Sequence, residues 1–311
     1  MKTPALHLGL FGFAVLHLLA SAPCSRADST IDPAAAFAWG GNIGWTNWRP
    51  SAADGAVIGE YVCSGSGFCA NIGWVNMGSG TPADGIRYGN AAAGDFGVNF
   101  TATVTPGRAA LRGFAYGANI GWINFEDLGD PHLDLTTGAL TGYAWSANCG
   151  WINLGTDTPN GVTTTSIAPG ADTDADGLAD AFEYENFSDL ATGSDTTDLD
   201  GDGQSDLSEA LDGTDPRDPD DSLRIVESTL FTDAVTDAMT LTFSTNTTRL
   251  YRIEQSEDLT LGGGWIDSGL GDFLADDLAT ARTVASPAGP RRFYRVLALR
   301  PLLSRRRNPR Q

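Results

Sequence analysis

A nine-residue motif recurs four times between residues 37 and 154, and this repeat restricts the possible folds more than any other feature. Each copy has an aromatic residue, two small or polar residues, Asn, an apolar residue, Gly, Trp, a variable residue and Asn. The copies are residues 39–47, 68–76, 116–124 and 145–153. The first and third Gly-Trp tryptophans lie 77 residues apart, as do the second and fourth. A pair of motifs has therefore been duplicated, and the fold must use one structural unit four times.

Each copy predicts a strand, a tight turn and a second strand. Gly and Asn mark the turn because both tolerate positive φ. The residues after the turn alternate in character, as in Ile120, Trp122 and Asn124, which is typical of a half-buried strand. We therefore predict an all-β domain over residues 28–155 with a core built from the repeated aromatics. Trp48 lies outside the motif and is the tryptophan that we expect to be exposed.

Three cysteines lie in this region. Cys63 and Cys69 flank a Gly/Ser-rich insertion found only in the second copy, and we predict a disulfide between them. Cys149 stands where the other copies have Ile, which favours a buried small hydrophobic residue over a reactive thiol.

The N-terminus predicts a secretory signal peptide over residues 1–27. Lys2 precedes an apolar run over residues 5–20, and the small residues Ser25 and Ala27 precede the expected cut. No later segment has 18 consecutive apolar residues, so we expect no transmembrane segment. The expected location is secreted, extracellular or at the cell surface.

Composition excludes several kinds of catalytic site. Beyond the signal peptide there is no lysine, and His132 is the only histidine. P-loop, Schiff-base and histidine-rich zinc chemistry are therefore excluded. The net charge of −20 disfavours nucleic acid as a partner, because its phosphate backbone is also negatively charged. We expect no enzyme, although a two-carboxylate glycoside hydrolase stays open. Its candidate acids are Glu60, Glu126, Asp127 and Asp134.

Most of the negative charge lies in one segment. Residues 172–221 carry 18 acidic side chains against the single cation Arg217. Within it, residues 172–183 and 198–209 both have Asp at positions 1, 3, 5 and 9, Gly at position 6 and Glu at position 12. Alternate carboxylates, the carbonyl of residue 7 and a final Glu can surround a hard cation that needs 6–8 oxygens. The predicted ligands of about two Ca²⁺ ions are Asp172, Asp174, Asp176, Leu178, Asp180 and Glu183, and Asp198, Asp200, Asp202, Gln204, Asp206 and Glu209.

This segment, with Gly213-Thr214-Asp215-Pro216 after the second loop, resembles bacterial thrombospondin type 3 repeats. It is also similar to the EF-hand-like loops of dockerins. The resemblance implies a spacer of a secreted or surface protein that folds when it binds calcium, and the dockerin likeness further implies a cohesin partner. The aromatic motifs resemble Gly-Tyr-Ala-Trp and Asn-Ile-Gly-Trp-Ile-Asn repeats of bacterial secreted proteins.

The rest of the chain divides by composition. Residues 156–171 are expected to be a linker, and residues 172–222 a short helical calcium-binding connector with a short helix after each loop. Six predicted strands over residues 223–300 suggest a small β-sandwich, and residues 301–311 form a basic tail. The expected fold class is therefore mainly β.

Two functions remain open from the sequence. The first is a non-catalytic structural or adhesion protein whose calcium loops rigidify a connector that holds two β-domains apart. The alternative is a carbohydrate-binding module that uses exposed aromatics, with Trp48 as the expected glycan contact. Its expected partner is an extracellular polysaccharide or another cell-envelope component.

Overall fold

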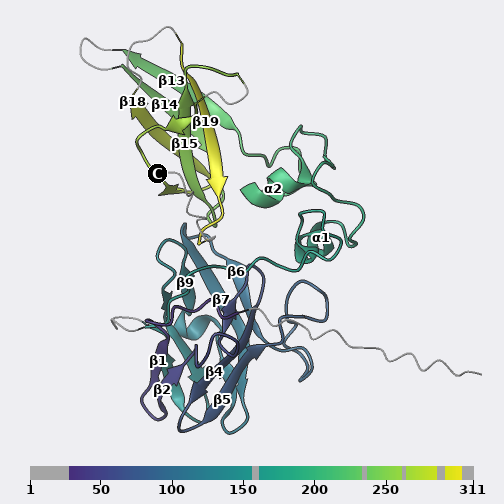
Figure 1. Cartoon of the computed structure of the whole chain (residues 1–311), viewed down its shortest axis with the longest axis vertical. Coiled ribbons are helices and arrows are strands. Elements are labelled where there is room, and N and C mark those ends of the chain that lie inside the picture. The colour runs from purple at the N-terminus through teal and green to yellow at the C-terminus, as the bar shows by residue number, and fades with distance from the viewer. Residues whose placement is uncertain (1–27, 156–160, 233–236, 261–263, 286–290, 303–311) are drawn as a thin grey trace, which may run out of the picture.

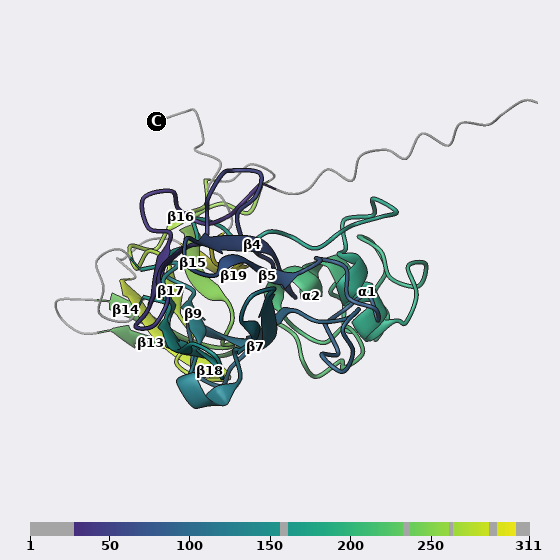
Figure 2. The ribbon, with the colours of Figure 1, turned by 90° about the horizontal axis from the view of Figure 1, so that it is seen from below.

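The computed structural model describes residues 28–155, 161–232, 237–260, 264–285 and 291–302. The predicted signal peptide and residues 303–311 of the predicted tail lie outside this range. The described chain is mainly β with two short α-helices, as the sequence predicted. Figure 1 shows two β-domains stacked along the long axis, with both helices to one side of their junction, and Figure 2 shows the same from below.

The N-terminal domain is a closed barrel built from the four repeats, each of which forms one hairpin. The hairpin strands are β1 (Phe37–Gly40) and β2 (Gly44–Asn47), β4 (Cys63–Cys69) and β5 (Gly73–Gly78), β7 (Arg108–Gly117) and β8 (Gly121–Asn124), and β11 (Tyr143–Ser146) and β12 (Gly150–Asn153). Each hairpin pairs antiparallel with the next, and β12 pairs with β1. The eight strands therefore form a ring without an edge.

The strand register explains how the ring closes. Inside each hairpin the two motif aromatics are paired, as in Trp39 with Trp45. Between hairpins, the final Asn of each motif pairs with the first aromatic of the next copy, as Asn47 does with Phe68. This Asn lies two residues after the Gly-Trp tryptophan. This two-residue offset recurs at all four junctions, so the barrel has eight strands and a stagger of eight residues. Such a barrel has an interior just wide enough to be filled by side chains.

The prediction of an aromatic core is wrong. Small and branched side chains such as Ala38, Ile43, Ala115 and Ile123 fill the interior. The eight paired motif aromatics point outward and are 38–51% exposed; we call them the aromatic belt, and they are Trp39, Trp45, Phe68, Trp74, Tyr116, Trp122, Trp145 and Trp151. Two facing rows of indole rings would not fit inside so narrow a barrel, and the smaller residues of the alternation therefore turn inward.

Two predictions about single residues in this domain are also wrong. Trp48 is only 4% exposed and packs in the barrel core, so it offers no surface to a glycan. Cys63 and Cys69 are the first and last residues of the same extended strand, about 20 Å apart by strand geometry, and both are free and buried. Cys149 is buried at the Ile position of its repeat, as predicted.

Short elements extend the barrel at one end. They are β3 (Val57–Ile58), β6 (Val98–Ala102), the 3-10 helix η1 (Asp127–Gly129), β9 (His132–Asp134) and β10 (Leu140–Thr141). Part of the expected linker belongs here as well, because Thr164 pairs with Ile31, and Val162 and Ile167 lie in the barrel core. Residues 161–168 are therefore part of the first domain and not a free linker.

The connector, residues 172–222, contains α1 (Asp180–Asn186) and α2 (Asp206–Asp212), one after each acidic loop. Leu178, Phe182 and Ala210 pack the two loop-helix units together. Gly213 ends α2 in a left-handed conformation, as is common at helix C-termini. Neither helix of the described chain is long and apolar enough to cross a membrane.

The C-terminal domain consists of two sheets. One contains β13 (Ile225–Thr232), β14 (Asp237–Ser244) and β18 (Ala279–Ala285); the other contains β15 (Leu250–Ser256), β16 (Ile266–Asp267), β17 (Phe273–Leu274) and β19 (Phe293–Leu299). Phe243 from the first sheet and Tyr251 from the second lie in one shared core, with ring centroids 5.6 Å apart.

The two β-domains touch directly. The Gly107 amide donates to the Thr247 carbonyl at 3.0 Å, and the Thr247 hydroxyl donates to the Thr103 carbonyl at 2.7 Å. The expectation that the connector holds the domains apart is therefore wrong. The connector packs beside the contact instead of between the domains (Figure 1).

Candidate metal centre

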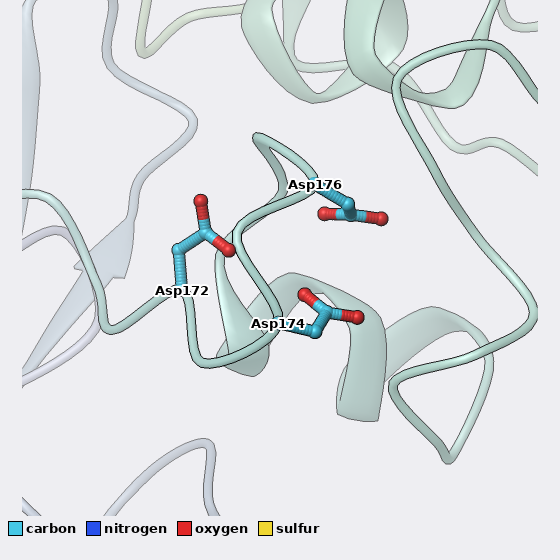
Figure 3. A group of neighbouring side chains, drawn as sticks. All are labelled: Asp172, Asp174 and Asp176. Carbon is cyan, nitrogen blue, oxygen red and sulfur yellow. The ribbon is translucent and has the colours of Figure 1, made fainter.

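Each acidic loop brings three carboxylates together. One oxygen from each of Asp172, Asp174 and Asp176 lies within 4.8 Å of the other two, and Asp198, Asp200 and Asp202 form the same group in the second loop. Figure 3 shows the three side chains of the first loop around a shared space. These are positions 1, 3 and 5 of each loop, and the structure brings them together as the spacing predicted.

The backbone of the two loops is shaped in the same way. Gly177 and Gly203, at position 6, have φ values of +98° and +97°, which residues with a side chain rarely adopt. Their amides donate to the position-1 carboxylates of Asp172 and Asp198 at 3.2 and 3.0 Å. The loop therefore turns sharply at position 6 and directs position 1 back toward the rest of the cluster.

The position-12 glutamates are buried acidic groups. Glu183 and Glu209 are fully buried, on α1 and α2. Within the residues that the structure describes, neither Oε atom of Glu183 has a hydrogen-bond partner. Oε2 of Glu209 also lacks one, while its Oε1 accepts from the Thr214 hydroxyl at 3.3 Å. Burial, followed by the neighbouring aspartates, raises the pKa of each carboxyl to about 7. An unpaired buried carboxylate is costly unless a cation or a proton neutralises it.

The position-9 aspartates hold the loop together. Both oxygens of Asp180 accept hydrogen bonds from Thr173, at 2.7 Å from its amide and 2.6 Å from its hydroxyl. Asp206 likewise accepts from the Leu199 amide at 3.1 Å and from the Thr197 hydroxyl. This contact with position 2 closes the start of each loop onto its helix, and a direct or water-mediated role as ligand stays a prediction.

The position-7 residues differ between the loops. The Leu178 side chain is buried in the small core of the connector, and its amide donates to Asp176 at 2.9 Å. The Gln204 amide makes the matching bond to Asp202 at 2.7 Å. The predicted contribution of the position-7 carbonyls to ion binding stays a prediction.

The first half of the connector is fixed to the barrel. The Arg87 guanidinium pairs with Glu185 of α1 at 2.6 Å and lies over the Tyr61 ring, with 5.5 Å between its Cζ and the ring centroid. Tyr61 packs against the small core that contains Phe182.

The second half is fixed to the C-terminal domain. Arg249 donates from Nε to the Leu211 carbonyl at 2.8 Å and from Nη2 to the Ala210 carbonyl at 3.0 Å. Arg300 donates to the same Ala210 carbonyl at 3.3 Å. Cations near a helix C-terminus satisfy its unpaired carbonyls and oppose its dipole. No pattern in the sequence indicates this contact, because both arginines are distant from α2 along the chain.

Three of the four acids considered for hydrolysis are engaged by neighbouring side chains, and the fourth is exposed. Glu60 lies 3.7 Å from Arg249 and 3.4 Å from Arg300, so it ties the barrel to the same junction. Asp127 pairs with Arg112 at 2.7 Å while staying exposed. Asp134 accepts three bonds from Thr136 and Thr137, which hold its pKa below the usual range despite partial burial. Glu126 is exposed at the start of η1.

The first Asn of each repeat has a role that the sequence did not reveal. Its Nδ2 donates to the carbonyl of the residue before the turn glycine in the preceding copy. The four bonds are Asn42 to Cys149 at 3.1 Å, Asn71 to Ile43 at 2.9 Å, Asn119 to Ile72 at 3.0 Å and Asn148 to Ile120 at 2.8 Å. They form a closed cycle at the hairpin tips, which we call the asparagine ring. Its only signal in the sequence is the presence of Asn at this position in all four copies.

The candidate metal centre thus consists of two loops of equal design, each with three clustered carboxylates followed by a buried glutamate, in a connector that packs beside the contact between the two β-domains. No protein-family model matches the chain, and comparisons with curated proteins and with solved structures find no match.

Proposed function

We propose that this chain is a secreted or cell-surface, non-catalytic structural or adhesion protein whose connector binds two Ca²⁺ ions. The ions order the connector, and the ordered connector fixes the barrel relative to the C-terminal domain, which we take to be a small β-sandwich. The likeness of the loops to thrombospondin type 3 and dockerin repeats supports the same proposal.

One observation carries it. Glu183 is fully buried with both carboxylate oxygens unpartnered, and three aspartate carboxylates lie in the loop that precedes it. A hydrophobic environment and like charges both oppose its ionisation. A divalent cation would convert this repulsion into attraction and supply the missing partner.

The donor set favours calcium over other metals. Every candidate ligand is a carboxylate or carbonyl oxygen, which suits hard cations, whereas zinc and copper prefer nitrogen and sulfur. Flexible loops that offer many oxygens suit the 6–8 ligands of Ca²⁺ better than the strict octahedron of Mg²⁺.

The attachments of the connector explain why ion binding would affect the whole molecule. α1 is fixed to the barrel through Arg87 and Tyr61, and α2 to the C-terminal domain through Arg249 and Arg300. Because each position-12 glutamate lies on one of these helices, an ion bound in either loop holds the helix that contacts the neighbouring domain.

Calorimetric calcium titration of residues 28–311, after removal of metal with a chelator, tests the proposal. We expect two ions per chain. Glu183→Gln should remove or strongly weaken one site and Glu209→Gln the other, because each keeps the shape of the side chain but loses its charge. Asp195→Asn is the matched control: it removes one charge from an exposed position between the loops and should leave two sites intact. Absence of saturable binding at millimolar calcium would refute the proposal.

A further inference from the structure

The aromatic belt is a second surface that the connector does not explain. Its eight rings form four pairs across the hairpins, with centroids 4.8–5.2 Å apart and planes inclined by about 60°. Each ring is more than a third exposed, although burial is the ordinary state of a tryptophan in a folded domain. A contiguous exposed aromatic surface marks an interaction site more often than chance.

Amide groups separate the aromatic pairs around the belt. Asn47 follows Trp45 on the same outer face of β2 and pairs across the junction with Phe68 of the next hairpin. Asn76 is placed in the same way beside Tyr116, and Asn124 beside Trp145. Around the barrel, pairs of belt aromatics therefore alternate with single Asn side chains, and none of these residues is charged.

These amides are held in a fixed orientation. Oδ1 of Asn47 accepts from the Arg49 amide at 2.9 Å, and Oδ1 of Asn76 accepts from the Gly78 amide at 2.8 Å. Among the described residues, no acceptor is found for Nδ2 of either side chain. These two junctions therefore each present an oriented N–H donor beside an aromatic ring, which is the combination of apolar face and placed polar group found in ligand sites.

One of the four copies already receives a ligand-like group from the chain itself. Phe96 stands 5.2 Å from Trp122 and 6.1 Å from Tyr116, edge to face with both rings. A hollow lined by Ala91, Ala92 and Ala93 lies beside these rings. The third aromatic pair therefore accepts a flat apolar group from outside its own hairpin. In the part of the chain that the structure describes, the first pair has only its strand neighbour Phe37, edge to face with Trp45 at 6.3 Å, and the second pair, Phe68 and Trp74, has no third ring beside it.

We infer that the first two copies bind a neutral polysaccharide through the juxtaposition of Trp45, Asn47 and Trp74 on adjoining hairpins. The C–H face of a sugar ring carries slight positive charge and packs on the negative face of an aromatic ring. Its hydroxyls accept from the oriented amide. Trp45 and Trp74 stand on β2 and β5, two positions apart in the sheet, with about 10 Å between the strand axes, so a chain of a few sugars can reach from one to the other.

Charge selects this occupant over others. The belt is neutral, but the chain carries a net charge of −20, which repels acidic polysaccharides, anionic lipid surfaces and further copies of the same chain. The inference does not depend on the calcium loops, since none of the belt residues belongs to them.

The test is retention of residues 28–311, with calcium present, by insoluble cellulose, xylan, chitin and β-1,3-glucan, followed by calorimetry with soluble oligosaccharides of any polymer that retains it. Trp45→Ala with Trp74→Ala should weaken binding at least about tenfold, and Asn47→Ala by about threefold. Phe231→Ala, at an aromatic residue that is 56% exposed in the other domain, should bind normally. Phe96→Ala should raise the binding capacity by opening the third copy.

Circular dichroism of each variant separates a lost contact from a lost fold. Failure of every neutral polysaccharide to retain the folded protein would overturn the inference. So would equal retention of the double variant, or a response of the belt variants only in self-association or in binding to anionic vesicles.

Discussion

The barrel and the connector are both duplicated structures, but they satisfy their polar groups in opposite ways. In the barrel, each copy donates an uncharged amide to a carbonyl of the copy before it, and the asparagine ring closes within the chain. In the connector, each copy gathers carboxylates that repel one another and buries a glutamate. Within the described ranges Glu183 has no hydrogen-bond partner, and Glu209 accepts only a 3.3 Å bond from the Thr214 hydroxyl. The hydrogen bonds of the first repeat are made within the chain, whereas the carboxylates of the second need a cation or a proton. Calcium concentration and pH near neutrality should therefore change the stability of the connector and not that of the barrel.

Chelation of calcium should produce the largest difference between the two regions. An ion present at about 100 times its dissociation constant stabilises the folded form by about 2.7 kcal/mol, so two sites would contribute about 5 kcal/mol. Hydrogen exchange should show loss of protection over residues 172–222 on addition of chelator, with the barrel hairpins unchanged. Equal loss of protection in both regions would erase the distinction between them.

Removal of one member of the asparagine ring should weaken the barrel alone. Asn119→Ala deletes the donor to the Ile72 carbonyl and should lower the free energy of unfolding by about 1–2 kcal/mol. Tryptophan fluorescence during denaturation reports the change, since seven of the eight tryptophans lie in the barrel. Asn186→Ala is the control, because its Nδ2 makes a comparable 3.0 Å bond to the Phe182 carbonyl inside the connector. An equal loss in both variants would show that the ring has no special role.

Calcium affinity should fall as pH falls through neutrality. The pKa values of Glu183 and Glu209, about 7 in the ion-free protein, mean that each carboxyl must lose a proton before it can bind the ion. Between pH 8 and pH 6, the affinity of each site should decrease about tenfold. Calorimetry in two buffers of different ionisation enthalpy would detect the released protons.

The ion-free connector should show the reverse trend. A carboxyl whose pKa is raised in the folded state binds more protons folded than unfolded, so stability falls as pH rises from about 4.5 to about 7. Increased protection of the ion-free connector above pH 7 would contradict the assignment of these pKa values.

A change at position 4 of the first loop should have the smallest effect. Ala175 has a φ of +64°, whereas the second loop has Gly201 at +79° in the same place. Ala175→Gly should relieve backbone strain in the folded loop but increase the conformational entropy of the unfolded chain. The free energy of unfolding should therefore change by at most about 1 kcal/mol. Calcium titration should show the first site equal to or slightly tighter than before. A marked loss of affinity would mean that the two loops are less alike than their backbones indicate.

The sequence predicted local structure better than long-range structure. The four hairpins and the two acidic loops followed from short motifs, since turn glycines and carboxylate spacing act over a few residues. The closure of β12 onto β1 joins residues more than 100 positions apart, and nothing local specifies it. The outward direction of the tryptophans depends on that closure, because alternation defines two faces of a strand and only the narrow barrel decides which one is interior.

The same reason explains the errors at single residues. Trp48 was expected to be exposed because it lies outside the motif. For the same reason it does not share the outward-facing positions of the belt aromatics, and its side chain packs in the core. Cys63 and Cys69 flank what looks like a loop, yet Gly65 and Gly67 continue a single strand that keeps the thiols apart. In the connector, Glu183 and Glu209 were predicted as ligands, but no pattern in the sequence predicted that both would be completely buried.

The direction of the asparagine ring has a consequence for the origin of this domain. Every amide donates to the copy before it. The bond from Asn42 to Cys149, which joins the first and last copies, is equivalent to the three bonds between consecutive copies. The seam between the first and last strands is therefore no different from the other seams. A half-length chain with two hairpins would possess both complementary ends, and two such chains could close on each other as a symmetric dimer. The present domain then has the form of that dimer fused into one polypeptide, and a circular permutant that begins at any other seam should fold to the same barrel.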